Sequence, residues 1–482
     1  MNHPDFIRHN AVELETRRFF LKKSMACIGG MAFGTLFGTR VAGAAGMPAP
    51  HHPARAKRVI YIHLAGAPSQ IETFDYKPEL TKLDGQPCPD SFLKGRRFAF
   101  IKGVPKMLGP QVEFARHGQS GAWFSADLPE LARLADKMTF VKSMWTEQFN
   151  HAPAQLMLQT GSQLKGRPCL GSWAFYGLST ENQDLPGFIV LTSGGKNPDA
   201  GKTVWGSGFL PGIFQGVQCQ GHGEPILFAA NPEGVTRDQR RATIDAVNAI
   251  NRKTGEEFGD PETITRISQY ELAFRMQMSV PEATDVASEP AHIHVMYGTE
   301  PGKNSFANNC LLARRLCERG VRFVQLYDWG WDAHGDNEGT SLTGGIRRKA
   351  ATMDKALAAL LRDLDQRGML QDTLVVCGAE FGRTPMKENR NAGKDNPFAG
   401  RDHSPGGFTV WLAGGGAKPG LSYGETDEFA YQAVIDKVHV HDLNATILHL
   451  LGFDHEKLTY FFQGRNYRLT DVQGHVVKAL LA

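Results

Sequence analysis

The chain has 482 residues, of which 41% are hydrophobic and 21% charged, and its formal net charge is +3. This composition is typical of a folded globular protein and excludes a disordered chain, a collagen and a coiled-coil rod. Residues 1–44 hold six of the 53 Lys and Arg residues and three of the 50 acidic residues, so the rest of the chain is formally neutral. A nucleic-acid-binding protein needs a basic patch in its folded body, and no dense run of Lys and Arg occurs there. We therefore expect no nucleic-acid partner.

The first 44 residues have the features of an export signal. Residues 16–22, Thr-Arg-Arg-Phe-Phe-Leu-Lys, resemble the twin-arginine signal. The apolar stretch that follows, 25–37, contains three glycines and is shorter than the about 20 apolar residues of a membrane-spanning helix. Ala42-Gly43-Ala44 then fits a signal-peptidase cleavage site. The sequence predicts a signal peptide over 1–44, the alternative being an ordinary amphipathic helix.

No later stretch is long and apolar enough to cross a bilayer. We therefore expect a periplasmic or extracellular mature protein without a transmembrane segment. A Pro-, Ala- and His-rich linker over 45–56 precedes its folded part. None of the cysteines forms a C-x-x-C pair, so no thiolate zinc site is predicted.

Strands and helices alternate along most of the remaining chain. Strands are predicted over 58–64, 139–143, 321–327, 373–378 and 408–413. Helices are predicted over 128–134, 152–159, 308–318, 346–366 and 443–451, the last with Asp442 as its N-cap. This alternation favours an α/β fold, with a mostly parallel sheet and helices on both faces.

Residues from about 192 to 300 interrupt the alternation. Residues 192–223 are Gly-rich and loop-like, and two helices are predicted over 237–251 and 262–278. We interpret this region as an insertion or cap on one large domain over 57–482.

Several polar clusters lie where predicted strands end, which is where ligands bind in open α/β sheets. The sharpest is Asp332-Ala333-His334, because residues i and i+2 of an extended loop point to the same side. A carboxylate and an imidazole there suit one divalent cation. The other candidates are Ser69, Asn150, His151, Glu380, Arg383 and His403.

These candidates also have ordinary structural interpretations. His151 precedes a predicted helix and is equally compatible with a capping or core histidine. Glu380 and Arg383 are compatible with a local ion pair that fixes their loop, and the segment 401–403 is compatible with a surface loop that holds a salt bridge.

Residues from about 57 to 482 resemble the domain of unknown function 1501 family, which belongs to the alkaline-phosphatase-like superfamily. The resemblance rests on motifs that span nearly the whole mature chain, at 66–75 with Lys77-Pro78, 171–178, 331–337, 380–385, 400–403, 424–428 and 441–448. It implies an alkaline-phosphatase-like sheet, but the family motifs do not specify one reaction.

The resemblance also implies roles for individual residues. Asp332, His334 and His403 match one metal position of the superfamily, and Glu380 is a further candidate ligand. Phe381 stands where a second metal ligand is expected, so a single divalent ion is implied, with zinc as one candidate.

His151 stands at the nucleophile position, where the superfamily has Ser or Thr. A metal ligand, a general acid or base and a nucleophile are the alternative roles for this residue. Arg383 is a candidate for oxyanion binding through its planar fork, and Ser69 and Asn150 are candidates for substrate binding.

Two functions follow from this comparison. The first is an exported metal-dependent hydrolase of phosphate or sulfate esters, acting on an ester or glycan-type small molecule at an altered site. The second is a non-catalytic binding or assembly protein on a degraded scaffold of the same kind. Fold alone does not decide between them.

Overall fold

The computed structural model describes residues 48–219, 234–258, 261–390 and 397–482. The predicted signal peptide, 1–44, lies outside these residues. Among the described helices, none has both the length and the apolar character needed to cross a membrane. The described part of the predicted linker runs along the end of a helix near the C-terminus, where the amide of His51 donates to the carbonyl of Gly452 and that of Arg55 to Leu450.

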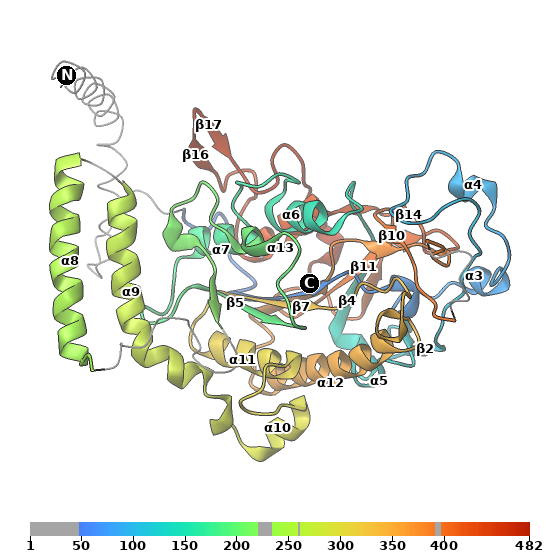
Figure 1. Ribbon diagram of the computed structural model, residues 1–482, viewed down its shortest axis with the longest axis horizontal. Helices are drawn as coiled ribbons and strands as arrows, with labels where there is room; N and C mark the ends of the chain where they lie inside the picture. Colours follow the sequence, from blue (N-terminus) through green and yellow to red (C-terminus); the bar gives the residue numbers. More distant parts are fainter. Residues whose placement is uncertain (1–47, 220–233, 259–260, 391–396) are drawn as a thin grey trace, which may run out of the picture.

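A nine-stranded sheet forms the centre of the molecule (Figure 1). Its strands lie in the order β12-β4-β11-β8-β1-β7-β5-β6, and β15 also pairs with β4. Their bounds are β1 Arg58–Ala65, β4 Met138–Trp145, β5 Phe188–Ser193, β6 Val217–Cys219, β7 Phe323–Trp329, β8 Thr373–Gly378, β11 Phe408–Ala413, β12 Leu421–Tyr423 and β15 Val438–His439. All described pairs in this sheet are parallel except those of β11, so the prediction of a mostly parallel sheet is confirmed.

Strand β11 runs antiparallel to both of its neighbours, β4 and β8. Phe408, at its start, pairs with Met144 near the end of β4, while Ala413 pairs with Met138 at the beginning of β4. The residues just before β11 therefore lie at the carboxyl ends of the parallel strands. This reversal brings the segment 401–403 to the edge where the loops after β1, β7 and β8 also meet.

Helices cover both faces of the sheet, as predicted (Figure 1). One face carries α6 His151–Thr160, α7 Leu170–Leu178 and α13 Val440–Leu450, whose apolar side chains share a core with Val59, Tyr61 and Val376. The opposite face carries α5 Pro129–Ala132, α10 Ala291–Tyr297, α11 Phe306–Glu318 and α12 Gly345–Gln366. The alternate residues Ile60 and Ile62 of β1 belong to this second core, as the period of two along a strand requires.

Smaller elements complete the described chain. The short helices are α3 Pro78–Lys82 and α4 Asp90–Leu93. Two-stranded ribbons are formed by β2 Phe114–His117 with β3 Ala122–Ser125, β9 Gly382–Arg383 with β10 His403–Ser404, β13 Glu425–Thr426 with β14 Ala433–Ile435, and β16 Tyr460–Phe462 with β17 Arg465–Tyr467.

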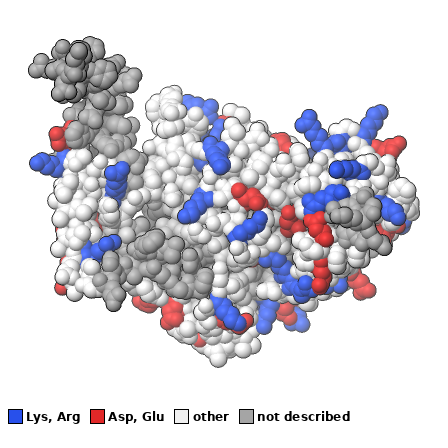
Figure 2. Space-filling model, viewed as in Figure 1, with Lys and Arg blue, Asp and Glu red and all other residues white. Residues whose placement is uncertain are grey.

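The region 192–300 contains a long helical hairpin, α8 Arg237–Phe258 and α9 Pro261–Thr284, which stands at one end of the molecule (Figure 1). The same region also contributes β6, the edge strand of the central sheet, which pairs with β5. On the face shown in Figure 2, acidic and basic side chains are intermixed over the body of the molecule.

The predicted start of the last helix is wrong. Asp442 was expected as the N-cap, but α13 begins at Val440 and His439 is its N-cap. The side chain of Asp442 accepts a hydrogen bond from the His439 amide at 2.9 Å, while the His439 ring accepts from the amide of His441. The carboxylate of an acidic residue at the third position of a helix accepts a hydrogen bond from a free backbone amide, as the side chain of an N-cap does. This similarity explains why the predicted start of the helix is three residues too late.

A buried ion-pair network joins α11 to α12 and to the segment before α10. Arg314 is 1% exposed and contacts Glu289 at 2.8 Å, Glu318 at 2.6 Å and Asp363 at 2.8 Å. Arg315 contacts the second carboxylate oxygen of Glu289. Burial alone would raise the pKa of Glu289, but the two guanidinium groups lower it from an ordinary 4.5 to about 2.

The Glu289→Gln variant is expected to lose stability at neutral pH by about 3–5 kcal/mol, because Gln leaves the charges of Arg314 and Arg315 short of a buried partner. The stabilisation by Glu289 is complete above pH 4.5 and disappears as the pH falls toward 2, since the folded-state pKa lies below the unfolded one. Urea unfolding at several pH values measures the difference between wild type and variant. A difference that stays constant down to about pH 2 would contradict this prediction.

Candidate metal centre

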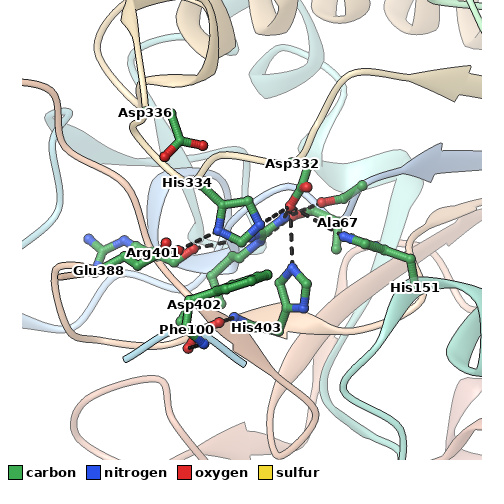
Figure 3. A network of polar contacts seen from close by, with 12 residues as sticks. Ala67, Phe100, His151, Asp332, His334, Asp336, Glu388, Arg401, Asp402 and His403 are labelled. Atoms are coloured by element: carbon green, nitrogen blue, oxygen red, sulfur yellow. Dashed lines mark hydrogen bonds and ion pairs between the residues drawn. The ribbon is translucent and has the colours of Figure 1, made fainter. Parts of the chain in front are cut away.

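Four side chains converge at the carboxyl edge of the sheet (Figure 3). Each of His151, Asp332, His334 and His403 offers one metal-ligand atom, and these atoms all lie within 4.8 Å of one another. The Asp332 Oδ1 atom lies 2.8 Å from His334 Nε2 and 3.3 Å from the Nε2 atoms of both His151 and His403. Three imidazole nitrogens thus surround one carboxylate oxygen.

Different parts of the chain bring these residues together. His151 is the first residue of α6, Asp332 and His334 lie in the loop after β7, and His403 opens β10 just before β11. Two glycines permit the close packing of these loops. Gly66 has φ +102°, and a Cβ there would lie 2.6 Å from the Asp332 nitrogen; a Cβ on Gly400 would lie 2.0 Å from the His334 carbonyl carbon. Side chains at these positions would push the Asp332–His334 loop out of place.

Each histidine is oriented by a contact at its other ring nitrogen. The Nδ1 atom of His151 lies 2.7 Å from Glu380 Oε1, that of His403 lies 2.8 Å from the Phe149 carbonyl oxygen, and that of His334 contacts Glu388. Such contacts turn the Nε2 atoms toward a common point, as carboxylates and carbonyls do behind metal-bound histidines.

The donor set fits a divalent metal ion. The Nε2 atom of His151 is buried and makes no hydrogen bond, its contact with Asp332 Oδ1 being a 3.3 Å ion pair, although a buried nitrogen of this kind normally has one. A cation among the four ligand atoms would satisfy it. Imidazole nitrogens together with a carboxylate oxygen are typical of zinc and of similar borderline ions.

The Arg383 side chain contacts Asp332 from the interior of the protein and holds it in position. Its guanidinium is fully buried and donates to Asp332 Oδ1 at 2.6 Å, to the Ala67 carbonyl at 2.8 Å, to the Arg401 carbonyl at 3.1 Å and to the Gly66 carbonyl. All three of its nitrogens therefore have partners within the protein. In this arrangement Arg383 holds the Asp332 carboxylate in place, and its oxyanion role stays a prediction.

Glu380 lies behind His151, outside the group of four. Its fully buried carboxylate accepts from His63 Nε2 at 2.9 Å and from Gln155 Nε2 and the Gly66 amide, both at 3.1 Å, in addition to contacting His151. The structure thus places this predicted ligand one layer further from the centre, where it orients His151.

The electrostatics of the centre favour the metal-binding forms of Asp332 and His403, whereas contacts with carboxylates raise the pKa values of His151 and His334. Burial opposes ionisation of Asp332, but Arg383 and the three imidazoles hold its pKa well below the usual range. Burial, together with the charges of Arg383 and His151, lowers the pKa of His403 to about 4, so this ring is neutral at pH 7. Burial also works against a charged His151, yet contacts with Asp332 and Glu380 raise its pKa to about 9. Metal ligands must be deprotonated, so ion binding displaces a proton from His151 if that ring joins the ligands.

The remaining predicted residues lie at the ends of short helices. Ser69 is buried and caps the 3-10 helix Gln70–Glu72, its Oγ accepting from the Ile71 amide at 3.3 Å. Asn150 is exposed and is the N-cap of α6, where its backbone carbonyl accepts from the Ala154 amide.

Three contributors to the centre were not predicted from the sequence. They are Glu388, which contacts His334, His63, which contacts Glu380, and Phe100. The Phe100 ring packs edge-on against His334 and His403, with centroids 4.9 and 5.8 Å away (Figure 3). Its loop is held there by Asp402, whose carboxylate accepts from the amides of Phe100 and Ile101 at 2.8 and 2.9 Å.

The model of the family described as "Protein of unknown function (DUF1501)" matches residues 56–481. The chain belongs to this family. All four residues of the metal centre lie within the matched range, so the centre is part of the family domain. A comparison with curated proteins gives no match.

Solved structures with an overall likeness to this DUF1501 chain include a sulfatase from Pseudoalteromonas sp., with 13% identity, a TM-score of 0.37, and coverage of 83% of this chain and 69% of that one. The alkaline phosphatase from the Antarctic bacterium TAB5 has 11% identity and a TM-score of 0.28, with 75% and 92% covered. The lipoteichoic acid synthase LtaP from Listeria monocytogenes has 10% identity and a TM-score of 0.32, with 83% and 73% covered. Scores this low transfer no property to the chain.

The Glu388→Gln variant is expected to bind a divalent ion about 10–100-fold more weakly than wild type, because the carboxylate that raises the basicity of His334 loses its charge. Competition with a chromophoric chelator measures the affinity. Glu79→Gln is the matched control, since Glu79 is half exposed on α3 and, among the described residues, pairs only with Lys82. Equal affinities of wild type and Glu388→Gln would show that Glu388 does not support the centre.

Proposed function

We propose that this protein is an exported metal-dependent hydrolase of phosphate or sulfate esters with a single-metal site. The observation that carries the proposal is the convergence of three imidazole Nε2 atoms on Asp332 Oδ1, each imidazole being oriented by a partner at its Nδ1 atom. Asp332, His334 and His403 would hold the ion. When bound, the ion polarises an ester oxygen and lowers the pKa of a water molecule to about 7.

His151 is the residue that we assign to proton transfer. A catalytic zinc site has three protein ligands and one open position, and the His151 ring borders the group formed by the other three residues. Its Nδ1 atom is held by Glu380, which in turn contacts His63, so the Nε2 atom has a fixed direction. A ring fixed in this way can deliver a proton to a leaving oxygen or take one from an attacking water. The side chains of His151 and Asp332 are the more exposed members of the group, at 13% and 27%, which leaves a side from which substrate can approach.

The second candidate is a binding or assembly protein in which the metal is structural. Four protein ligands close a tetrahedral ion and leave no position for water or substrate. The presence of a fourth suitable ligand, His151, favours this possibility.

Elemental analysis of the purified full-length protein, followed by a panel of phosphate monoesters, phosphate diesters and sulfate esters, tests the proposal. We expect one divalent ion per chain and turnover of at least one ester class, both of which are lost in His334→Ala. Protein that folds without metal and turns over no ester would overturn the proposal. One tightly bound ion without turnover would favour the structural role.

A further inference from the structure

Two short strands, β12 and β15, pair with different parts of the outer edge of β4. β12 pairs with Thr139–Val141 and β15 pairs with Met144–Trp145, whereas neither of them pairs with Lys142 or Ser143. At this point the chain leaves the sheet through Gly424, whose φ is +68° and where a Cβ would collide with Ser143 Oγ. A cavity of about 360 Å³ opens beside the gap. This volume lies within the range of about 300–1,000 Å³ that small-molecule sites occupy.

Lys142 is one of the residues that line the cavity. Its side chain is partly buried, and no hydrogen bond or ion pair joins it to another described residue. Burial lowers the pKa of Lys142, although the nearby charges of Asp75 and Glu425 act in the opposite direction. A ligand that supplies a hydrogen-bond acceptor beside this ammonium would form a charge-assisted hydrogen bond with it.

Asp75 supplies a second buried polar group in the same wall. It is 1% exposed, its Oδ2 atom accepts from the Thr426 hydroxyl, and its Oδ1 atom has no hydrogen bond. Lys77 Nζ lies 3.3 Å from this Oδ1 atom and donates to the Thr426 carbonyl at 3.1 Å. Carboxylate and ammonium groups therefore lie side by side in this wall, with Asp75 Oδ1 buried against Lys77.

Aromatic rings form another part of the wall. Tyr76, Trp123 and Tyr423 all line the cavity. The rings of Tyr76 and Trp123 have centroids 4.8 Å apart, and Phe114 supports Tyr76 from 5.1 Å. These contacts, together with the Arg116 guanidinium that lies over the Trp123 ring at 5.0 Å from its centroid, fix the two rings beside the charged groups.

We propose that this cavity binds a sugar unit of a glycan. Each sugar hydroxyl can donate a hydrogen bond to a carboxylate and accept one from an ammonium group, and both kinds of group line the cavity. The C–H face of a sugar ring can pack on the aromatic wall. The carboxylates of Asp75, Glu425 and Asp436 in the lining disfavour a strongly anionic ligand such as a phosphate. None of the four metal-centre residues lines the cavity, so this site is separate from the proposed catalytic one.

Isothermal titration calorimetry of the full-length protein with glucose, galactose, N-acetylglucosamine and glucuronate tests the proposal. We expect saturable binding of at least one of these sugars, with a dissociation constant on the order of 1 mM. Lys142→Met and Trp123→Ala should each weaken it by about tenfold or more, because each removes a principal contact. Lys137→Met is the matched control, since this half-exposed lysine just before β4 pairs with Asp365 and does not line the cavity.

Thermal unfolding of each variant establishes that it is folded before binding is compared. The His403→Ala variant should bind the same sugar as wild type even though its metal centre is disrupted, which keeps this inference separate from the hydrolase proposal. Absence of binding for all four sugars, or unchanged binding in both Lys142→Met and Trp123→Ala, would overturn it.

Discussion

Replacing His151 with alanine is expected to lower kcat for ester hydrolysis by about 10²–10⁴-fold, while one divalent ion per chain remains bound. The reason is that, in the proposed mechanism, Asp332, His334 and His403 would supply the three ligands of an open site and His151 would transfer the proton beside them. Elemental analysis and initial rates on the same preparation measure the two effects.

The comparison with His334→Ala and His403→Ala makes the result decisive. These two variants should lose the ion and the activity together, because each removes a ligand. If His151→Ala also loses the ion, His151 is a ligand of a closed, four-coordinate site, and the assignment of proton transfer to it is wrong.

The Arg383→Leu variant is expected to unfold about 3–5 kcal/mol more easily than wild type. The substitution leaves the buried side of Asp332 without its guanidinium partner, and three backbone carbonyls lose a donor. Arg383→Lys should recover only a part of this loss, because a single ammonium group cannot reproduce the planar fork. Urea unfolding measures both variants.

Arg348→Leu is the control for the loss of an arginine as such. Arg348 is 64% exposed and pairs with Glu338 at the surface, where an ion pair contributes about 0–1 kcal/mol. Equal destabilisation in Arg348→Leu and Arg383→Leu would show that the buried contacts of Arg383 are not the source of its effect.

The sequence predicted the structure best where a local pattern, such as an apolar run or a short spacing between polar residues, was strong. The bounds of β8 and β11 agree with those predicted from apolar runs, because both strands are buried and end at turn residues. The pair Asp332 and His334 could be recognised because both residues lie on one loop two positions apart. His403 was recognised from its motif and its place just before a predicted strand.

The sequence could not show how deep each polar side chain lies. Glu380 and Arg383 are residue types that bind metals and anions, and only the packing of the β1, β7 and β8 loops around them places both behind the centre. Glu388 was missed for a related reason, since its partner His334 lies 54 positions away and no local spacing connects them. The one feature of the sequence that pointed to Glu388 was its position shortly after the loop that contains Arg383.

The reversed direction of β11 has a consequence for how the metal centre assembles. The four residues of the candidate centre come from positions 151, 332, 334 and 403, and the pairing of β11 with β4 and β8 holds His403 at the edge where the other three lie. We therefore expect a chain fragment that ends before β11 to bind metal more weakly than the complete domain. If the proposed ion binds the native state alone, it adds about 2.7 kcal/mol to the stability of the whole domain at 100 times its dissociation constant. Metal supply would thus set the resistance of the protein to unfolding as well as its activity.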